Sequence, residues 1–478
     1  MTDSTERQSG TLVGRTLSNL AVAWREIAQG AARSIGLNDS AVAAGKPEAL
    51  KALMAECLEA RGGEVSARMR AAELGKVYLD LDGEGRRRFL ETLAGAFATD
   101  EAALDAAIDD YRAAETPEAR AAARRRLRRA SVPPRVKLIT QFNDLPEGVK
   151  FLVDMRADLL STPDRGPTLD DLDADLRELL ASWFDTGFLD LHRVTWQSSA
   201  ALLEKLIAYE AVHAIQSWDD LRHRVESDNR RLFALFHPRM PQEPLAFVEV
   251  ALVRGLAGSI QALLDPAAPG NGVRGADTAI FYSITNTQKG LRGISFGDYL
   301  IKRVVRQLSR EMPRIKVYAT LSPLPGFRAW LARRAATEVA AAMSESEQGG
   351  IRALGGSDDP AAALKAVLAR PDWHRDPVVV KALKDPLQRL CARYLTDRRE
   401  AGGPVDAVAR FHLRNGARLE RINWLGDTSP GGLERSAGLM ANYRYDLDDI
   451  EANHEAFVKD GRIAMSSDVR ALARPLRG

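Results

Sequence analysis

One stretch of the chain, residues 279–327, constrains the possible folds more than any other. Residues 279–284 (AIFYSI) are rich in β-branched and aromatic side chains and predict a strand. A turn with two glycines, QKGLRGI, follows it. Residues 298–312 then place apolar side chains four residues apart, which predicts an amphipathic helix. The run 317–322 (VYATLS) predicts a second strand, which Pro323 and Pro325 end in a rigid corner.

A strand that leads through a glycine turn into a helix is suited to binding an anion. The first backbone N–H groups of a helix have no partner within the helix, and the helix dipole favours negative charge there. A pyrophosphate group, such as that of coenzyme A, fits such a turn. An ordinary strand–helix–strand crossover would show the same pattern.

Composition limits the classes of partner. The chain of 478 residues has 67 basic and 65 acidic side chains and a formal net charge of +2, so no overall field attracts nucleic acid. Two cysteines do not make a disulfide scaffold and fit a reducing compartment. No residue cluster has metal-ligand spacing, and no stretch approaches the roughly 20 apolar residues of a spanning helix. With neither a secretory signal nor a peroxisomal C-terminus, we expect a cytoplasmic protein without membrane or nucleic-acid partners.

The chain divides into two regions of different character. Residues 17–182 are dominated by Ala, Leu, Glu and Arg and predict helices, including a solvated one that carries the run 124–129 (RRRLRR). Beyond residue 183, strands and helices mix. We therefore predict an α+β protein, with an all-α N-terminal domain over residues 1–175 and a mixed α/β domain over residues 176–478. Its sheet is expected to be mostly antiparallel with one parallel crossover.

Several blocks resemble the malonyl-CoA decarboxylase family. They occur in family order over residues 151–445 and read FDTGFLDLHRVTW, HPRMPQEPLAFVEVAL, SITNTQKGLRGISFGDYLIKRVV, TLSPLPGF, FHLRNGARLERINW and SAGLMANYRY. The resemblance implies a catalytic domain built like the GNAT acetyltransferases and a helical N-terminal domain through which the chain forms a homo-oligomer. It implies malonyl-CoA as the substrate and no cofactor, because coenzyme A is part of the substrate.

The resemblance also implies a set of site residues. Ser322 stands at the family's active-site serine, His412 at its catalytic histidine, and Tyr445 at a tyrosine that orients this histidine. The malonyl-CoA-binding turn corresponds to Arg292, Gly293, Ile294, Ser295, Phe296, Gly297 and Asp298, and Ser322 and His412 also contact the substrate. Members of the family often have an acidic residue where this chain has Ser295. With Ser295 in place of this acid, two roles stay open for Ser322: a serine activated by a neighbouring group, or a hydrogen-bond donor only.

Without the resemblance, these residues would also fit purely structural roles. Ser322 fits the cap of a turn, His412 fits a structural histidine in a strand that leads into the Asn415-Gly416 turn, and Tyr445 fits a core aromatic.

Decarboxylation of a malonyl thioester requires that an enolate be stabilised and its carbon protonated. We expect Ser322 to hold the malonyl group and His412, switching charge near pH 6.5, to supply the proton without a metal. Two alternatives remain open at this point: an acyl-CoA-dependent acyltransferase, and a non-catalytic sensor that binds acyl-CoA.

Overall fold

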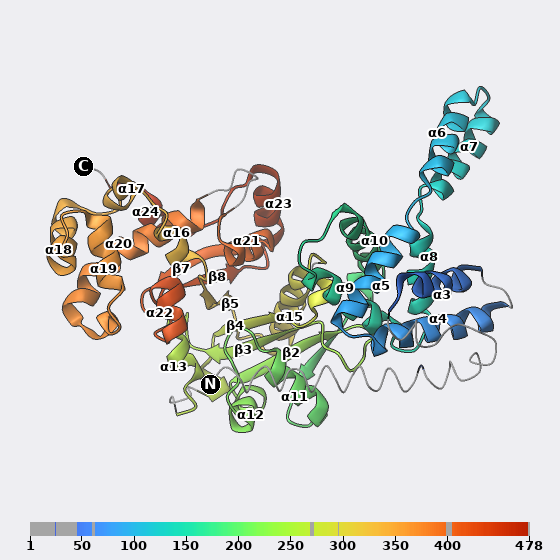
Figure 1. Cartoon of the computed structure of the whole chain (residues 1–478). Helices are drawn as coiled ribbons and strands as arrows, with labels where there is room; N and C mark the ends of the chain where they lie inside the picture. The colour runs from blue at the N-terminus through green and yellow to red at the C-terminus, as the bar shows by residue number, and fades with distance from the viewer. Residues whose placement is uncertain are drawn as a thin grey trace.

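The computed structural model describes Trp24 and residues 45–59, 63–267, 272–294, 296–397 and 404–476. Its first part is helical and its second part contains the sheet, which confirms the predicted α+β class (Figure 1). The helices of the first part are α3 (Pro47–Glu59), α4 (Gly63–Asp80), α5 (Gly83–Ala96), α6 (Glu101–Ala113), α7 (Pro117–Ala130), α8 (Pro134–Asn143), α9 (Gly148–Ser161) and α10 (Pro167–Trp183). Helix α10 runs through residue 175, the predicted limit of the first domain, which stays a prediction.

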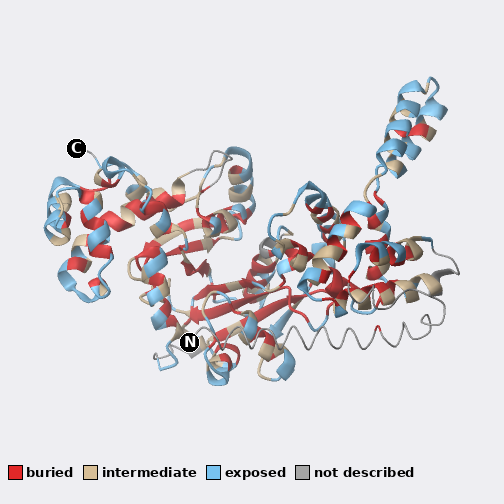
Figure 2. Cartoon of the chain, in the orientation of Figure 1, coloured by how far each residue is buried: buried red, intermediate tan, exposed pale blue. Residues whose placement is uncertain are grey.

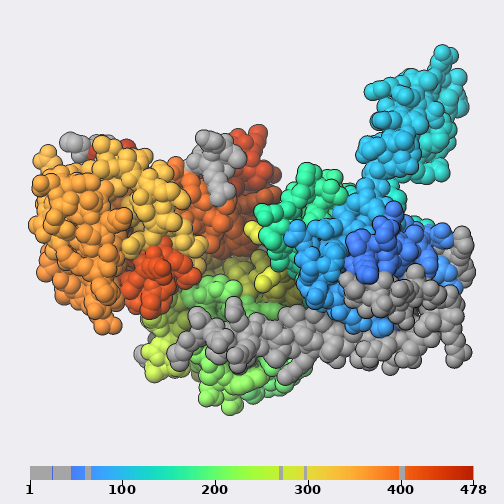
Figure 3. Space-filling view, in the orientation of Figure 1, coloured from blue at the N-terminus to red at the C-terminus, as the bar shows by residue number. Residues whose placement is uncertain are grey.

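Helices α6 and α7 form an antiparallel hairpin that stands clear of the rest of the molecule (Figures 1 and 3). Within it only Ala107 and Ala123 are buried among hydrophobic side chains. The five arginines of residues 124–129 are exposed, as expected for a solvated helix face. The other helices of this part pack around a cluster of aromatic rings in which Trp24 contacts Phe142 and Phe151.

The second part is built on one eight-stranded sheet. Its strands are β1 (Asp190–Val194), β2 (Arg230–Phe236), β3 (Ala246–Val253), β4 (Thr278–Asn286), β5 (Val317–Thr320), β6 (Ser322–Pro323), β7 (Arg418–Asn423) and β8 (Met440–Tyr445). The order is β1-β2-β3-β4-β5-β8-β6, and β7 pairs along the other edge of β8, over Met440 to Arg444. Among the strands of the described residues, only β4 and β5 run parallel, which confirms the predicted single crossover.

Helices cover the sheet, and others lie beyond one end of it. Between β1 and β5 lie α11 (Ala200–Tyr209), α12 (Trp218–Glu226), α13 (Ile260–Leu264), α14 (Gly272–Gly275) and α15 (Gly297–Glu311). Between β6 and β7 come α16 (Phe327–Leu331), α17 (Ala336–Ala340), α18 (Glu345–Gly355), α19 (Pro360–Leu368), α20 (Pro377–Thr396) and α21 (Ala407–Arg414). The last helices are α22 (Pro430–Ser436), α23 (Ile450–Asp460) and α24 (Ser467–Ala473). Burial is concentrated in the central strands and the helix faces turned toward them (Figure 2).

Candidate active site

The parallel pair β4–β5 creates the edge at which the site lies. The two strands pair from Thr278 to Phe281 and from Val317 to Thr320. β4 then continues beside β3 to Asn286, whereas the chain after β5 passes into β6 and pairs with β8. Because the carboxyl ends of parallel strands meet at one edge of a sheet, the glycine turn after β4 and Ser322 after β5 open on the same side.

Three of the predicted residues form one hydrogen-bonded chain. Ser322 Oγ lies 3.0 Å from His412 Nε2, and His412 Nδ1 lies 2.7 Å from the Tyr445 hydroxyl. The three side chains come from β6, α21 and β8, which are adjacent because β6 and β8 pair directly. All three are buried, with Ser322 5% and His412 2% exposed. The structure therefore brings together the residues that the sequence named separately.

Thr320 sets the direction of this chain of hydrogen bonds. The Ser322 hydroxyl donates to Thr320 Oγ1 at 2.8 Å, and Thr320 Oγ1 also accepts the backbone N–H of Tyr443 at 3.1 Å. With its own proton engaged there, Ser322 accepts the proton on His412 Nε2. His412 Nδ1 is then the acceptor of the Tyr445 hydroxyl. The imidazole is thus held in one tautomer.

The environment of His412 keeps it neutral. Its ring stacks on Tyr443, with centroids 4.6 Å apart and planes inclined by 24°. Burial without an acidic partner lowers the pKa of His412 from its ordinary 6.5 to about 3, because the cation would be poorly solvated. In the site without substrate, His412 therefore does not change its charge near pH 6.5, and that expectation from the sequence is wrong for this state.

The prediction that His412 lies on a strand is wrong, because residues 407–414 form helix α21. Asp406 caps the helix by accepting the N–H of Ala409 at 2.7 Å. Ala409, His412 and Leu413 are buried at i, i+3 and i+4, which is helical spacing. The Asn415-Gly416 pair, predicted as a turn after a strand, instead ends the helix, with Gly416 at φ +83°.

The proline corner and helix α21 share one support. The Tyr394 hydroxyl donates to Asp406 Oδ2 at 2.7 Å, and a Cβ on Gly326 would lie 2.5 Å from the same hydroxyl. Tyr394 of α20 therefore touches both the corner that follows Ser322 and the cap of the helix that carries His412. This contact fixes the separation of the two side chains.

The predicted substrate turn leads from β4 into α15. Arg292 and Gly293 are exposed, Ile294 is half-buried, Phe296 is buried, and Gly297 and Asp298 begin α15; Ser295 lies outside the described residues. The N–H groups of Leu291, Arg292 and Ile294 donate within the turn. Among the described residues of the turn, the donors left for an anion are those of Gly293, at φ +85°, and of the first turn of α15, which has no side-chain cap.

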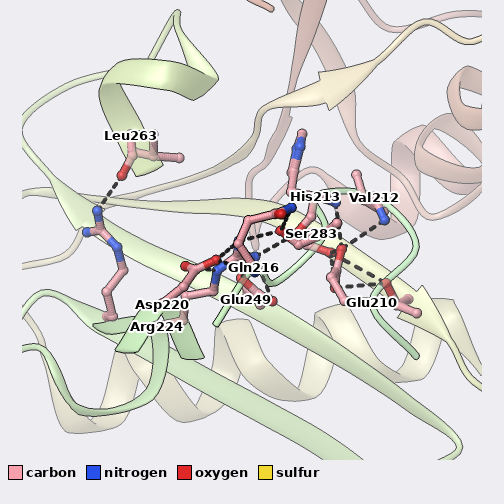
Figure 4. Close-up of polar contacts among 12 residues, drawn as sticks. Glu210, Val212, His213, Gln216, Asp220, Arg224, Glu249, Leu263 and Ser283 are labelled. Carbon is pink, nitrogen blue, oxygen red and sulfur yellow. Dashed lines mark hydrogen bonds and ion pairs between the residues drawn. The ribbon is translucent and has the colours of Figure 1, made fainter. Parts of the chain in front are cut away.

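A second buried polar network fixes β4 where it leaves β5 (Figure 4). Glu210 accepts the Ser283 hydroxyl at 2.8 Å and the backbone N–H groups of Val212 and His213, each at 2.8 Å. Arg224 lies 3.1 Å from Glu249, and burial raises the pKa of Glu249 to about 7. Glu210 thus ties the segment after α11 to the part of β4 beyond its pairing with β5, and Arg224 ties α12 to β3.

Models of two protein domains match the chain. The malonyl-CoA decarboxylase N-terminal domain matches residues 97–184, and the malonyl-CoA decarboxylase C-terminal domain matches residues 187–477. The chain belongs to the malonyl-CoA decarboxylase family. The resemblance on which the sequence analysis relied is therefore confirmed, and the family is one of carboxy-lyases.

Relatives of the malonyl-CoA decarboxylase family match over most of their length. The mitochondrial malonyl-CoA decarboxylase of Anser anser anser is 37% identical over 419 residues, which are 84% of this chain and 83% of that protein. That of Mus musculus is 35% identical over 425 residues, 86% and 83% of the two chains. The crystal structure of malonyl-CoA decarboxylase from Rhodopseudomonas palustris is 42% identical, with a TM-score of 0.79 over 89% of this chain and 99% of that one.

The family resemblance did not point to Thr320, although the sequence held a signal for it. Thr320 precedes Ser322 by two residues in an extended run, and residues at this spacing face the same side of a strand. In the described part of the chain, no group of three or more His, Cys, Asp or Glu side chains is placed to hold a metal ion. Within the same ranges, no helix is both long and apolar enough to cross a bilayer.

Proposed function

We propose that this protein decarboxylates malonyl-CoA to acetyl-CoA and carbon dioxide. The observation that carries the proposal is the chain of hydrogen bonds from Thr320 through Ser322 and His412 to Tyr445. It follows β5, at the sheet edge where the predicted anion-binding turn follows β4, in a member of the malonyl-CoA decarboxylase family. We propose that one acyl-CoA reaches both, with its phosphates at the turn and its malonyl group at Ser322 and His412.

The reaction divides into two steps. Cleavage of the bond between the carboxylate and the α-carbon releases carbon dioxide and leaves its electron pair as an enolate on the thioester. The Ser322 hydroxyl, turned from Thr320 toward the substrate, and nearby backbone groups hold the malonyl group and stabilise the charge that develops on the thioester oxygen. His412 then gives a proton to the α-carbon, which yields acetyl-CoA, and regains one from solvent.

The low pKa of His412 fits a donor that is charged only while substrate is bound. In the unliganded site the imidazole is neutral, with a pKa of about 3. A malonyl carboxylate in the same buried site brings a negative charge, which raises the pKa of a nearby histidine. We propose that His412 takes up a proton as substrate binds. Transfer of that proton to the enolate cancels both charges.

We propose that neither a metal nor another cofactor takes part in the reaction. We also propose that the chain forms a homo-oligomer through its helical domain. The proposed location of the protein is the cytoplasm. Free, buried Cys57 and Cys391 suit a reducing compartment. Light scattering on the full chain and on a variant without α6 and α7 would test the assembly.

The deciding experiment is an assay with malonyl-CoA as the sole substrate, in the presence of a strong chelator. We expect stoichiometric acetyl-CoA and carbon dioxide. An acyltransferase would require an added acceptor, and a sensor would bind malonyl-CoA without turnover. Loss of activity with the chelator, restored by a divalent ion, would contradict the metal-free mechanism while leaving the reaction itself in place.

A further inference from the structure

A buried arginine of the helical domain holds the substrate turn of the catalytic domain. Arg156, on α9 and 2% exposed, donates from Nη1 to the carbonyl oxygens of Gly290 at 2.7 Å and Arg292 at 2.9 Å. Its Nε donates to Asp173 of α10 at 2.8 Å. A guanidinium group held by a carboxylate is a rigid donor, so it fixes the two carbonyls toward α9.

The backbone of the turn lies directly against the same helix. A Cβ on Gly290 would be 1.7 Å from the carbonyl oxygen of Val153, so only glycine fits there. Helix α9 and the segment Lys289–Leu291 are in extensive contact, and α10 packs against α9. The helical domain is therefore one wall of the turn.

A second arginine of the helical domain is free at this wall. Arg177, on α10, is exposed, and its Cδ would lie 3.8 Å from a Cβ on Gly293. Within the ranges that the structure describes, its guanidinium has no hydrogen bond or ion pair. Among the described residues, an unpaired cation thus stands beside Gly293, whose N–H donates no hydrogen bond there.

A cavity of about 470 Å³ opens at the same place. Ala157, Leu160 and Ser161 of α9 line one side, and Lys289, Arg292 and Gly293 line the other. Its size falls within the roughly 300–1,000 Å³ of small-molecule sites. The two cations in its lining, Lys289 and Arg292, suit a phosphorylated nucleoside better than an acyl chain.

We propose that the helical domain forms half of the phosphate site for the coenzyme A moiety: Arg177 contacts a phosphate of the substrate, and Arg156 is a positioning residue that holds the turn. The proposal rests on acyl-CoA being the substrate, as proposed above. The phosphate is either in the diphosphate or at the 3′ position of the ribose, and the two are distinguished by the substrate used.

The test compares Arg177→Ala with the native full-length protein on three substrates: malonyl-CoA, malonyl-dephospho-CoA and malonyl-pantetheine. We expect KM for malonyl-CoA to rise about 10- to 100-fold with kcat unchanged, the worth of one hydrogen bond to a charged group. KM for malonyl-pantetheine, which has neither the diphosphate nor the ribose phosphate, should be the same in both proteins. If the loss persists with malonyl-dephospho-CoA the contact is to the diphosphate, and if it disappears the contact is to the 3′-phosphate.

Arg156→Lys tests the positioning role, because a lysine ammonium cannot reproduce the planar fork that reaches two carbonyls and Asp173. We expect a higher KM for malonyl-CoA, native kcat and native turnover of malonyl-pantetheine. Arg124→Ala, on the exposed face of α7, is the matched control and should behave as native. Binding of coenzyme A measured by calorimetry provides the same comparison without turnover.

Two results would overturn the proposal. One is an unchanged KM for malonyl-CoA in Arg177→Ala, and the other is an equal loss with malonyl-pantetheine. Either result leaves the decarboxylase proposal standing if the native protein turns over malonyl-CoA. Failure of the native protein to do so would instead remove the proposed function.

Discussion

The two ends of the proposed substrate site are built in opposite ways. At the reacting end, Ser322 and His412 are buried and joined by hydrogen bonds within the catalytic domain. At the phosphate end, Arg292 and Gly293 are exposed, and Arg156 reaches their turn from the helical domain. The difference suggests that the rate depends on a preformed interior, whereas affinity depends on a surface where two domains meet. Changes at the first end should alter kcat, and changes at the second should alter KM.

The largest expected effect is at the reacting end. His412→Asn should lower kcat by about 10²–10⁴ and Ser322→Ala by about 10²–10³, the usual worth of a general acid and of one donor to developing charge. Both act on one enolate, so the double variant should be little slower than His412→Asn alone. Single-turnover kinetics of the three variants, with coenzyme A affinity measured separately, checks this. Full additivity, or near-native single variants, would remove the pair from the chemistry.

Gly293→Val should change KM rather than kcat. The residue has φ +85°, where a β-branched side chain is strained by about 1–3 kcal/mol, and the turn would shift away from the phosphate. KM for malonyl-CoA should rise about 10-fold or more with little change in kcat. Gly356→Val is the control, because Gly356 also has a positive φ, at +68°, with nothing within 4 Å of its added Cβ. A loss of kcat alone in Gly293→Val would place the phosphate elsewhere.

A smaller effect is expected from Thr320→Val. Without the acceptor on Thr320, the Ser322 hydroxyl is free to donate to His412 Nε2, which forces the other tautomer. We expect kcat to fall about 10-fold, the scale of one lost hydrogen bond, and Thr320→Ser to restore most of it. Nitrogen NMR of the imidazole reads the tautomer directly. A native tautomer in the valine variant would show that Thr320 does not control it.

The pH dependence of stability tests the burial of His412 without measuring turnover. Its pKa is about 3 in the folded protein against about 6.5 unfolded, so between these values the unfolded chain binds one more proton. The free energy of unfolding therefore falls as pH is lowered from 6.5. His412→Asn lacks this contribution, so from pH 7 to pH 5 it should lose about 2 kcal/mol less than the native protein. Urea unfolding at the two pH values measures the difference, and parallel losses would contradict a neutral buried His412.

At the reacting end the sequence predicted the residues but not the helix that carries His412. At the phosphate end it predicted the turn but not the arginines of the helical domain beside it. Local patterns gave the strands around Ser322 and the helix after the turn, because each follows from spacing over a few residues. His412 was misassigned since the alternation in FHLR resembles a strand, while the stronger signal was the cap at Asp406. The roles of Arg156 and Arg177 had no local signal. Arg156 meets its carbonyl partners across 134 and 136 residues of chain, through a contact that only folding creates.

The fit of Gly290 against Val153 has a consequence for how such a protein can change over generations. The cavity beside it is lined by residues of both domains. At Gly290 no side chain of any kind is tolerated, since even a methyl group would collide with a backbone oxygen. The junction of the two domains therefore depends on a position that admits glycine alone, so a substitution there would push the two domains apart rather than reshape the pocket.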